Sequence, residues 1–315
     1  MSKINELVSQ IRELINEPRK HLAISEDDTE WYRLCSSLDA IGDTELAFHE
    51  YEKLSVPIKS RAIYILVYGF LQALYLQQDA VRNLHKALQI PYKSDPLLRE
   101  VREVRNAVVH PTDGGQSKEK RFRFISRMSL NKSGFQLVTV VPEMSLRKFI
   151  QVSLGSLLEK QHIQVENVLK ALLEKLRKEE MDYRNQIRGE SLESVFPDAL
   201  GYYFEKICES ARSGSSWEYG KAHIADICDI LENFKSALDE RQIAGAYSGI
   251  EYHLEHLKYP LRELARFFDE KGTGRLTEDD AEIFTVFVQN GMSQLQHMAR
   301  GIDDEIAIDS RTDSA

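Results

Sequence analysis

The stretch YILVYGFLQALYLQQDAVRNLHKAL, residues 64–88, indicates the fold most strongly. Its apolar residues recur with a period of about 3.6, which is typical of an amphipathic helix packed on a core. We predict one long helix over residues 58–89, ended by Pro91, because proline cannot continue a helix. The apolar stripe consists of Ile63, Leu66, Val67, Phe70, Leu71, Leu74, Val81, Leu84 and Leu88.

The rest of the chain has the composition of a helical protein. Among 315 residues there are 16 Gly and 8 Pro, which is too few for the many turns of a β-sandwich or barrel. We therefore expect an all-α fold, and the length favours about two domains. Further helices are predicted for residues 3–17, 30–54 (as one or two helices), 96–110, 145–188, 197–211, 217–238, 241–269 and 277–300.

One β-hairpin is predicted among these helices, at residues 121–141. Arginine and phenylalanine alternate at 121–124, which is the period of a strand, and turn-forming residues follow at 131–134. The predicted organisation is an N-terminal helix and connector at 1–29, a helical bundle with the hairpin at 30–189, a C-terminal helical domain at 190–302 and a disordered polar tail at 303–315.

Cysteine content, hydropathy and charge narrow the functional class. The 3 cysteines are too few for a disulfide scaffold and form no Cys-x-x-Cys pair, which favours a reducing compartment. The first residues do not resemble a signal peptide, and the most apolar window, residues 63–76, is too short to span a bilayer. We therefore predict a cytoplasmic protein without a membrane segment. The net charge of −9 excludes a globally basic nucleic-acid coat but permits a local basic patch.

A candidate catalytic motif lies in REVRNAVVHPT, residues 102–112, where Arg105, Asn106 and His110 fall at the end of a predicted helix. Chance alone predicts about 0.6 Arg-x4-His pairs in a chain of this composition. Requiring Asn directly after the Arg lowers that expectation to about 0.02. The pair formed by Arg105 and His110 is the only one with this spacing in the sequence.

With residues 64–88 and this motif, the chain resembles the HEPN family of small all-α domains, in the R-N-x3-H form of the family signature. The resemblance covers residues 30–189 and implies a helical bundle in which the hairpin is an insertion. It also implies a metal-independent ribonuclease without a cofactor, which pairs as a homodimer. Such proteins are often toxins or antiviral effectors, so an antitoxin or regulatory protein is an implied partner. Thr112 stands where some toxin relatives carry a tyrosine that an antitoxin modifies.

The chemistry of the motif residues suits metal-free RNA cleavage. The reaction needs a base for the 2′-hydroxyl, an acid for the leaving 5′-oxygen and positive charge at the phosphate. His110 can transfer protons, Arg105 can hold two phosphate oxygens, and Asn106 can orient a hydroxyl or the histidine. Since one chain supplies one such histidine, we predict a two-fold homodimer in which two motif ends share one site.

A basic segment follows the motif directly. Residues 118–132 hold six Lys or Arg residues against Glu119 alone, a local charge of +5 in an acidic chain. We expect Phe122 and Phe124 to pack on the bundle and to leave the basic face free for RNA. The predicted RNA-binding residues are Lys118, Lys120, Arg121, Arg123 and Arg127.

Other interpretations stay open on the sequence. His110 can be a helix-end residue that interacts with the helix dipole, and Arg105 can be an exposed charge paired with Glu100 or Glu103. The chain is then a non-catalytic HEPN-like module that binds RNA, nucleotide or protein, or a helical scaffold. No metal site is predicted, because the segment from Asp269 to Asp280 is more typical of a Gly-rich connection than of a calcium loop.

Overall fold

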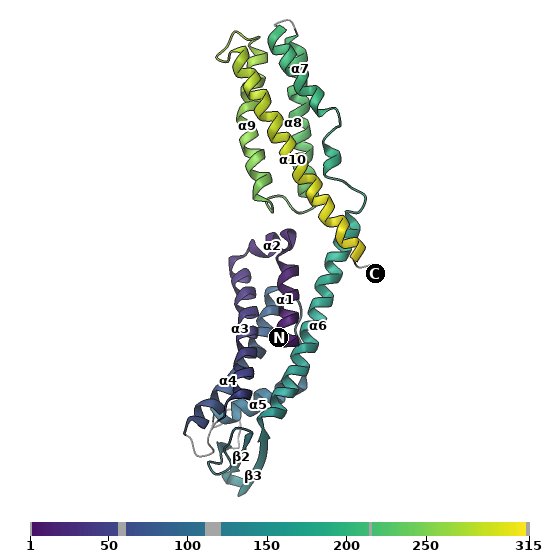
Figure 1. The fold of residues 1–315 in the computed structure, drawn as a ribbon. Coiled ribbons are helices and arrows are strands. Elements are labelled where there is room, and N and C mark those ends of the chain that lie inside the picture. Colours follow the sequence, from purple (N-terminus) through teal and green to yellow (C-terminus); the bar gives the residue numbers. More distant parts are fainter. Residues whose placement is uncertain (1, 56–60, 111–120, 214–215, 313–315) are drawn as a thin grey trace. The chain divides into compact units, whose positions relative to one another are not determined.

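A computed structural model gives the fold of the chain, which is mainly helical (Figure 1). The all-α prediction is confirmed, with one small β-sheet inserted among the helices. By its packing the chain divides into two compact units, Met1–Glu179 and Glu180–Ala315. No helix among the described residues combines the length and the apolar character needed to cross a bilayer. The structure describes residues 2–55, 61–110, 121–213 and 216–312.

The first unit contains α1 (Lys3–Ile15), α2 (Pro18–Ser25), α3 (Asp28–Lys53), α4 (Ala62–Ala87), α5 (Pro96–Val109) and most of α6 (Leu154–Gln186). The sequence predicts a polar connector where α2 lies. Pro18 allows this extra helix because its ring presets the φ angle of the first helical position. Helix α3 is a single helix. Asp27 caps its N-terminus, because the Asp27 carboxylate accepts from the Thr29 N–H at 2.8 Å.

Helix α4 packs through the apolar stripe that the sequence predicts. Its residues Val67, Leu71 and Leu74 have an exposed fraction of 0%, and α3 lies beside it (Figure 1). Helices α1, α3, α4 and α6 share one apolar cluster, in which Ile11 of α1 is also 0% exposed. The N-terminal helix is therefore part of the first core rather than a separate segment.

The sequence predicts a boundary between the units at residues 189 and 190, whereas the structure divides the chain inside α6. The last turns of α6 belong to the second unit, where the Tyr183 hydroxyl donates to the Arg241 carbonyl at 2.9 Å. The boundary lies within one continuous helix, so no change in composition marks it.

The inserted sheet is antiparallel, in the order β1 (Phe122–Ile125), β2 (Gly134–Val141), β3 (Leu146–Ser153). The predicted hairpin is β1 and β2. The sequence is wrong for β3, which it assigns to a helix starting at residue 145. Ser145 closes the turn before β3 in the left-handed region, at φ 48°, and the strand then pairs with the whole of β2. The spacing of its apolar residues fits both a helix and a strand, so only the pairing with β2 decides which of the two forms.

A buried tyrosine connects the sheet to α3. The Tyr51 hydroxyl donates to the Lys132 carbonyl at 2.7 Å, in the turn between β1 and β2. Burial raises the pKa of Tyr51 to about 12, so the hydroxyl keeps its proton and remains a donor at neutral pH. Beside it, the Lys132 ammonium donates to the Glu52 carbonyl at 2.7 Å. These contacts fix one end of the sheet against the bundle.

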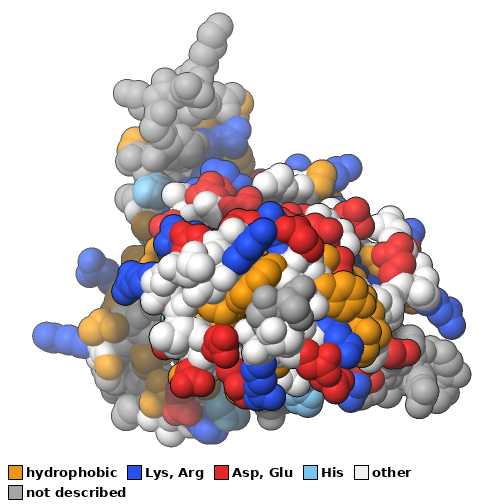
Figure 2. Space-filling view, turned by 90° about the horizontal axis from the view of Figure 1, so that it is seen from above, with side chains coloured by type: hydrophobic (Ala, Val, Ile, Leu, Met, Phe, Trp, Pro, Cys, Tyr) orange, Lys and Arg blue, Asp and Glu red, His pale blue; other side chains and the backbone are white. Residues whose placement is uncertain are grey.

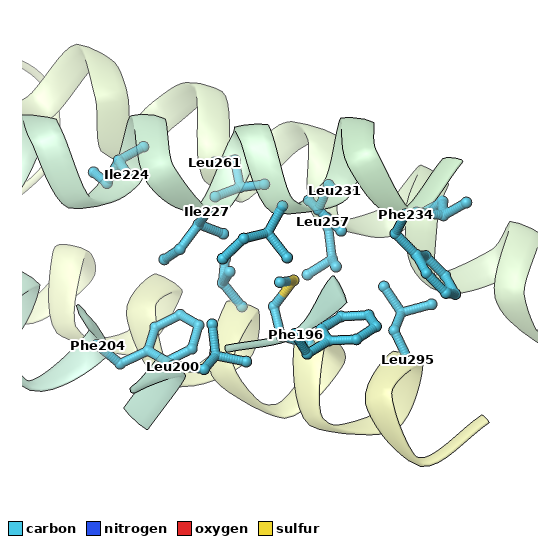
Figure 3. Close-up of a cluster of buried hydrophobic side chains, with 14 of the residues drawn as sticks. Phe196, Leu200, Phe204, Ile224, Ile227, Leu231, Phe234, Leu257, Leu261 and Leu295 are labelled. Carbon is cyan, nitrogen blue, oxygen red and sulfur yellow. The ribbon is translucent and has the colours of Figure 1, made fainter. Parts of the chain in front are cut away.

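The second unit is a helical bundle made of α7 (Leu200–Ser213), α8 (Trp217–Glu240), α9 (Ser248–Asp269) and α10 (Glu278–Thr312). Each helix packs on the next in chain order, and α10 packs on α7. Figure 3 shows the interior, where Phe196 and Phe234 lie close, with ring centroids 5.0 Å apart. On the face seen in Figure 2, acidic and basic side chains are interspersed among exposed hydrophobic ones, so neither charge dominates that view.

Helix α10 continues through Thr312, where the sequence predicts a disordered tail from residue 303. The helix continues because Ile302 and Ile306 extend the apolar stripe onto the core. Asp303 also accepts from the Leu192 N–H and from the Arg241 guanidinium, at 3.0 and 3.1 Å. The structure thus gives a helix for 303–312 where the sequence predicts a disordered tail, and residues 313–315 lie outside the described part.

Candidate active site

Helix α5 positions the motif at its C-terminal end. Asp95 caps the N-terminus by accepting from the Leu97 N–H at 2.7 Å, with Pro96 in the first helical position. At the other end, the N–H of His110 donates to the Asn106 carbonyl at 2.9 Å. The backbone then leaves the helix at φ −114° and ψ 83°. The motif therefore occupies the last turn of α5 and its cap.

The Arg105 guanidinium is held by groups from two helices. Its Nε and Nη2 donate to the Gln72 Oε1 on α4, at 3.3 and 2.8 Å, and its Nη1 donates to the Asn106 Oδ1 at 3.0 Å. The Arg105 Cζ also lies 4.1 Å from the ring centroid of Tyr75, within the range of a cation–π contact. These contacts fix the plane of a charged group that is only half-buried.

The pairing of Arg105 with Glu100 or Glu103 is not seen in the described part of the chain. The Glu100 carboxylate instead accepts from the Lys160 ammonium at 2.8 Å. Neutral acceptors thus orient Arg105 and leave its positive charge uncompensated by any carboxylate among the described residues. A guanidinium in this state can still attract a phosphate.

A second guanidinium, that of Arg102, lies against the same tyrosine ring. The Arg102 Cζ is 4.3 Å from the Tyr75 centroid, and its Nη2 donates to the Asp79 Oδ1 at 2.6 Å. Its Nε donates to the Gln78 Oε1 at 3.2 Å. Unlike Arg105, Arg102 has a carboxylate partner, so its role here is to fix α5 on α4.

A chain of buried hydrogen bonds runs from Arg102 into the core. The Gln78 amide donates to the Gln161 Oε1 at 2.8 Å, and the Gln161 amide donates to the Gln77 Oε1 at 2.9 Å. The Gln77 amide in turn donates to the Glu45 Oε1 at 2.7 Å. Because buried amides lose free energy when a partner is missing, this chain favours a single relative placement of α3, α4, α5 and α6.

Glu45 ends this chain as a buried carboxylate with an exposed fraction of 5%. Burial by itself raises its pKa, but hydrogen bonds and charge attraction from His162 and the Gln77 amide outweigh burial, and the pKa is lowered. The His162 Nε2 lies 3.1 Å from the Glu45 Oε1. The carboxylate therefore stays ionised at neutral pH and orients the amides bonded to it.

His110 is exposed at the end of α5. Its imidazole makes no hydrogen bond to another side chain in the described ranges, so it is accessible to a bound molecule. The residue caps the C-terminal end of α5, where the helix dipole is negative. The dipole interpretation and the catalytic interpretation are therefore compatible at this residue.

An open cavity of about 810 Å³ lies between part of α5 and one face of the sheet. Asn106 connects this cavity to the motif, because its side chain lines the cavity and also accepts from Arg105. Three of the lining residues, Arg123, Thr139 and Lys148, form one row across the sheet, since Thr139 is paired with both of the others. Other lining residues are Glu100, Glu103, Val104, Ala107, Arg121, Leu137, Val141, Met144, Leu146 and Ile150.

The predicted RNA-binding cations do not form one surface. Arg121 and Arg123 line the cavity, whereas Arg127 is exposed in the turn after β1 and is not among the lining residues. Lys118 and Lys120 lie outside the described residues. Lys148 on β3, which the sequence analysis did not single out, is a cavity residue as well.

The sequence is also wrong about which face of β1 packs on the bundle. Phe122 and Phe124 are 39% and 50% exposed, while Arg123 is half-buried on the face toward α5. The register explains the reversal, because Arg123 pairs with Thr139 on the same face of β2 as the fully buried Phe135. Neighbours in register share one face of a sheet, so β1 takes its orientation from β2.

Among the described residues no group of three or more His, Cys, Asp or Glu side chains is placed to hold a metal ion. Asp280, the last candidate in the loop-like segment, caps α10 instead. Its carboxylate accepts from the Thr277 N–H at 2.9 Å, and its own N–H donates to the Thr277 hydroxyl at 3.1 Å. This reciprocal pair is a capping box.

Besides Lys148, the sequence analysis missed Gln72, Tyr75 and Arg102 as site residues. Gln72, Tyr75 and Asp79 have the spacing i, i+3, i+7 and share one face of α4. Arg102 and Arg105 have the spacing i, i+3 on α5. Both patterns are visible in the sequence, but nothing local indicates that these two faces meet.

Compared with known proteins, the chain has no significant match to a family model, a curated protein or a solved structure.

Proposed function

We propose that the protein is a metal-independent endoribonuclease of HEPN type, in which Arg105 and His110 act on a scissile phosphate. The observation that carries the proposal is the arrangement at the end of α5. An exposed imidazole follows a guanidinium that neutral groups, Gln72 and Asn106, hold in place. A proton-transfer group and an oriented cation are two of the three groups that metal-free cleavage needs, and the third is a second proton-transfer group.

In this mechanism His110 takes the 2′-hydroxyl proton, and the resulting oxygen attacks the adjacent phosphorus. The bond to the 5′-oxygen breaks, that oxygen receives a proton from an imidazolium, and a 2′,3′-cyclic phosphate remains. Arg105 donates to the non-bridging oxygens as negative charge develops on them. Asn106, already bonded to Arg105, keeps the guanidinium aimed at the phosphate.

We propose a homodimer because base and acid act on opposite sides of the phosphorus. One chain presents one motif histidine. A two-fold axis close to the end of α5 supplies the second imidazole and a second Arg105 from the other copy. By this proposal the enzyme acts in the cytoplasm, which fits its free cysteines, and it is a toxin or phage-defence effector restrained by an antitoxin or regulatory protein.

The test is cleavage of labelled RNA in the presence of EDTA. The wild-type protein is expected to give fragments that end in 2′,3′-cyclic phosphate. His110→Ala is expected to lower the rate by about 10²–10⁴-fold, the usual contribution of acid–base catalysis. His256→Ala is the control, because His256 is also an exposed histidine and lies far from the motif in sequence, on α9. Equal rates for the wild type and His110→Ala refute the proposal.

A non-catalytic RNA-binding module is the second candidate. It is favoured by the exposed phenylalanines beside basic residues on the sheet, which need no catalytic group to bind RNA. Binding of RNA without any cleavage, by a protein that is folded and dimeric, supports this candidate over the enzyme.

A further inference from the structure

The open cavity between α5 and the sheet has a helix wall and a sheet wall. On the helix wall, Glu100, Glu103, Val104 and Ala107 follow the spacing i, i+3, i+4, i+7, so they share one face of α5. The volume of about 810 Å³ falls within the usual size of a small-molecule site, about 300–1,000 Å³. The cavity therefore has room for one organic ligand, and the chemistry of its two walls decides which kind fits.

The sheet wall carries positive charge in one row. Arg123, Thr139 and Lys148, the cationic row, lie side by side in the register, so two cations flank one hydroxyl. Lys148 is exposed and forms no ion pair within the described ranges. On β2 and β3 the neighbouring rows are apolar and consist of Val141 with Leu146 and of Leu137 with Ile150. This wall can hold an anionic group beside an apolar surface.

The two carboxylates of the helix wall differ in their partners. Glu100 accepts from the Lys160 ammonium at 2.8 Å, so its charge is compensated. Glu103 is exposed, and no ion pair or hydrogen bond joins its carboxylate to another side chain in the described part of the chain. An ionised carboxylate only accepts hydrogen bonds, and it repels anions. A ligand that suits both walls therefore presents N–H donors to Glu103 and an anionic group to the sheet.

Guanine has the edge that best fits a carboxylate. Its N1–H and N2–H donors lie side by side, so the two oxygens of one carboxylate can accept from both. Adenine and cytosine place an acceptor nitrogen beside their amino group, and uracil places its single N–H between two carbonyl oxygens. Such acceptors face a carboxylate unfavourably, because both carry negative charge. Of the four RNA bases, guanine therefore matches Glu103 best.

We propose that the cavity is a subsite for a guanosine next to the scissile phosphate of RNA. Glu103 accepts from the base, the apolar residues of the sheet cover it, and the cationic row holds a phosphate that is not cut. Asn106 joins the subsite to the motif, because its side chain lines the cavity and accepts from the Arg105 Nη1 at 3.0 Å. This inference rests on the proposed function, since it names the nucleotide at which the ribonuclease cuts.

The first test compares three RNAs of about 12 nucleotides that differ at one position. Each is an oligoadenosine with guanosine, inosine or adenosine at the centre, and inosine is guanosine without the N2 amino group. The full chain in EDTA should cleave the inosine RNA about tenfold more slowly than the guanosine RNA, and the adenosine RNA about a hundredfold more slowly. The cut should fall at a phosphate next to the guanosine. Equal kcat/KM for the guanosine and inosine RNAs overturns the assignment.

Glu103→Met removes both acceptor oxygens at an exposed position, where a substitution changes stability little. This variant should cleave the guanosine RNA about tenfold more slowly than the wild type, and it should no longer distinguish guanosine from inosine. Glu174→Met is the matched control and should keep the preference, since Glu174 is an exposed carboxylate of α6 that does not line the cavity. If Glu103→Met keeps the preference, or cleaves all three RNAs faster because the carboxylate only repels RNA, the subsite is refuted.

Lys148→Ala tests the phosphate contact. It should raise KM for all three RNAs by the same factor and leave the ratio of the guanosine rate to the inosine rate unchanged, because the cationic row contacts no base. The slope of log affinity against log salt should fall by about 0.7, the value for one phosphate contact of a single strand. A changed ratio with an unchanged slope means that Lys148 contacts the base, and it overturns this placement of the nucleotide.

Binding, measured by fluorescence anisotropy with the full chain carrying His110→Ala, separates this inference from the proposed function. If the guanosine RNA binds more tightly than the inosine RNA but the unmodified chain cleaves neither, the subsite stands and the ribonuclease is refuted. If the unmodified chain cleaves all three RNAs equally, the ribonuclease stands and the subsite is refuted. Tighter binding of free guanosine monophosphate than of the guanosine RNA assigns the cavity to a free nucleotide and overturns the RNA subsite. A chain that binds neither RNA nor guanosine monophosphate refutes both proposals.

Discussion

Gln72 offers the sharpest test of how Arg105 is positioned. Gln72→Met keeps the length of the side chain and removes the acceptor that receives two hydrogen bonds from the Arg105 guanidinium, at 2.8 and 3.3 Å. A hydrogen bond to a charged group contributes about 1.5–3 kcal/mol. Because Gln72 is exposed to water, we take a value just below this range, about 1.4 kcal/mol, which corresponds to a tenfold loss of kcat/KM.

The assay is the initial rate of RNA cleavage in EDTA at substrate concentrations below KM. Gln72→Met should fall about tenfold, well short of the effect of Arg105→Ala, because the guanidinium is still present but less fixed. Leu76→Met is the control, since Leu76 is an exposed residue of the same helix, 46% exposed. If Gln72→Met cleaves at the wild-type rate while Arg105→Ala does not cleave, the Gln72 contact does not position the guanidinium.

Three other predictions concern assembly and stability. The wild-type protein is mixed with a threefold excess of His110→Ala and compared with pure wild type at the same total protein concentration. Activity should fall to about one sixteenth if both histidines of a dimer are required, and to about one quarter if each chain works alone. Burial lowers the pKa of His85 below its ordinary value of 6.5, so the unfolded chain binds a proton at a higher pH than the folded chain does. The free energy of unfolding should therefore decrease as the pH falls below 6.5. His85→Phe should reduce this decrease, as measured by thermal melts at pH 7.5 and 5.5. Asp303→Ala leaves the Arg241 side chain, 4% exposed, without its carboxylate, and should cost about 3 kcal/mol in urea unfolding, whereas Asp304→Ala should be neutral within about 0.5 kcal/mol.

The helices could be predicted from the sequence because their apolar stripes are long. The α4 stripe is buried as its period indicates, with Val67 and Val81 both 0% exposed. Short elements were missed for a physical reason. Helix α2 has 8 residues and no strong stripe, so its packing on α3, rather than its own sequence, stabilises it. The strand β3 is decided by pairing with β2, a contact that its local sequence does not reveal.

The candidate site was predictable only in part. The motif itself has a sequence signature, and its place at the end of a helix follows from the cap at Asp95 and from the proline at residue 111. Gln72 and Tyr75, which hold Arg105, come from α4. Their i, i+3 spacing is common on helices, so it carries no information until the packing of α4 on α5 is known.

The orientation of β1 shows most clearly where local pattern fails. The alternating pattern of β1 indicates that Arg123 and Phe124 lie on opposite faces of the sheet, but it does not indicate which face is buried. The answer lies on β2, whose run from Phe135 to Val141 is apolar on both faces apart from Gln136 and Thr139, and therefore gives no alternation of its own. Burial of Phe135 at 0% exposure fixes β2, and pairing then turns the β1 phenylalanines outward. A slip of one residue in this register would bury the rings, expose the cations and change the lining of the cavity. The cavity beside the motif therefore depends on this register, and its lining should change in any variant that shifts β1 on β2.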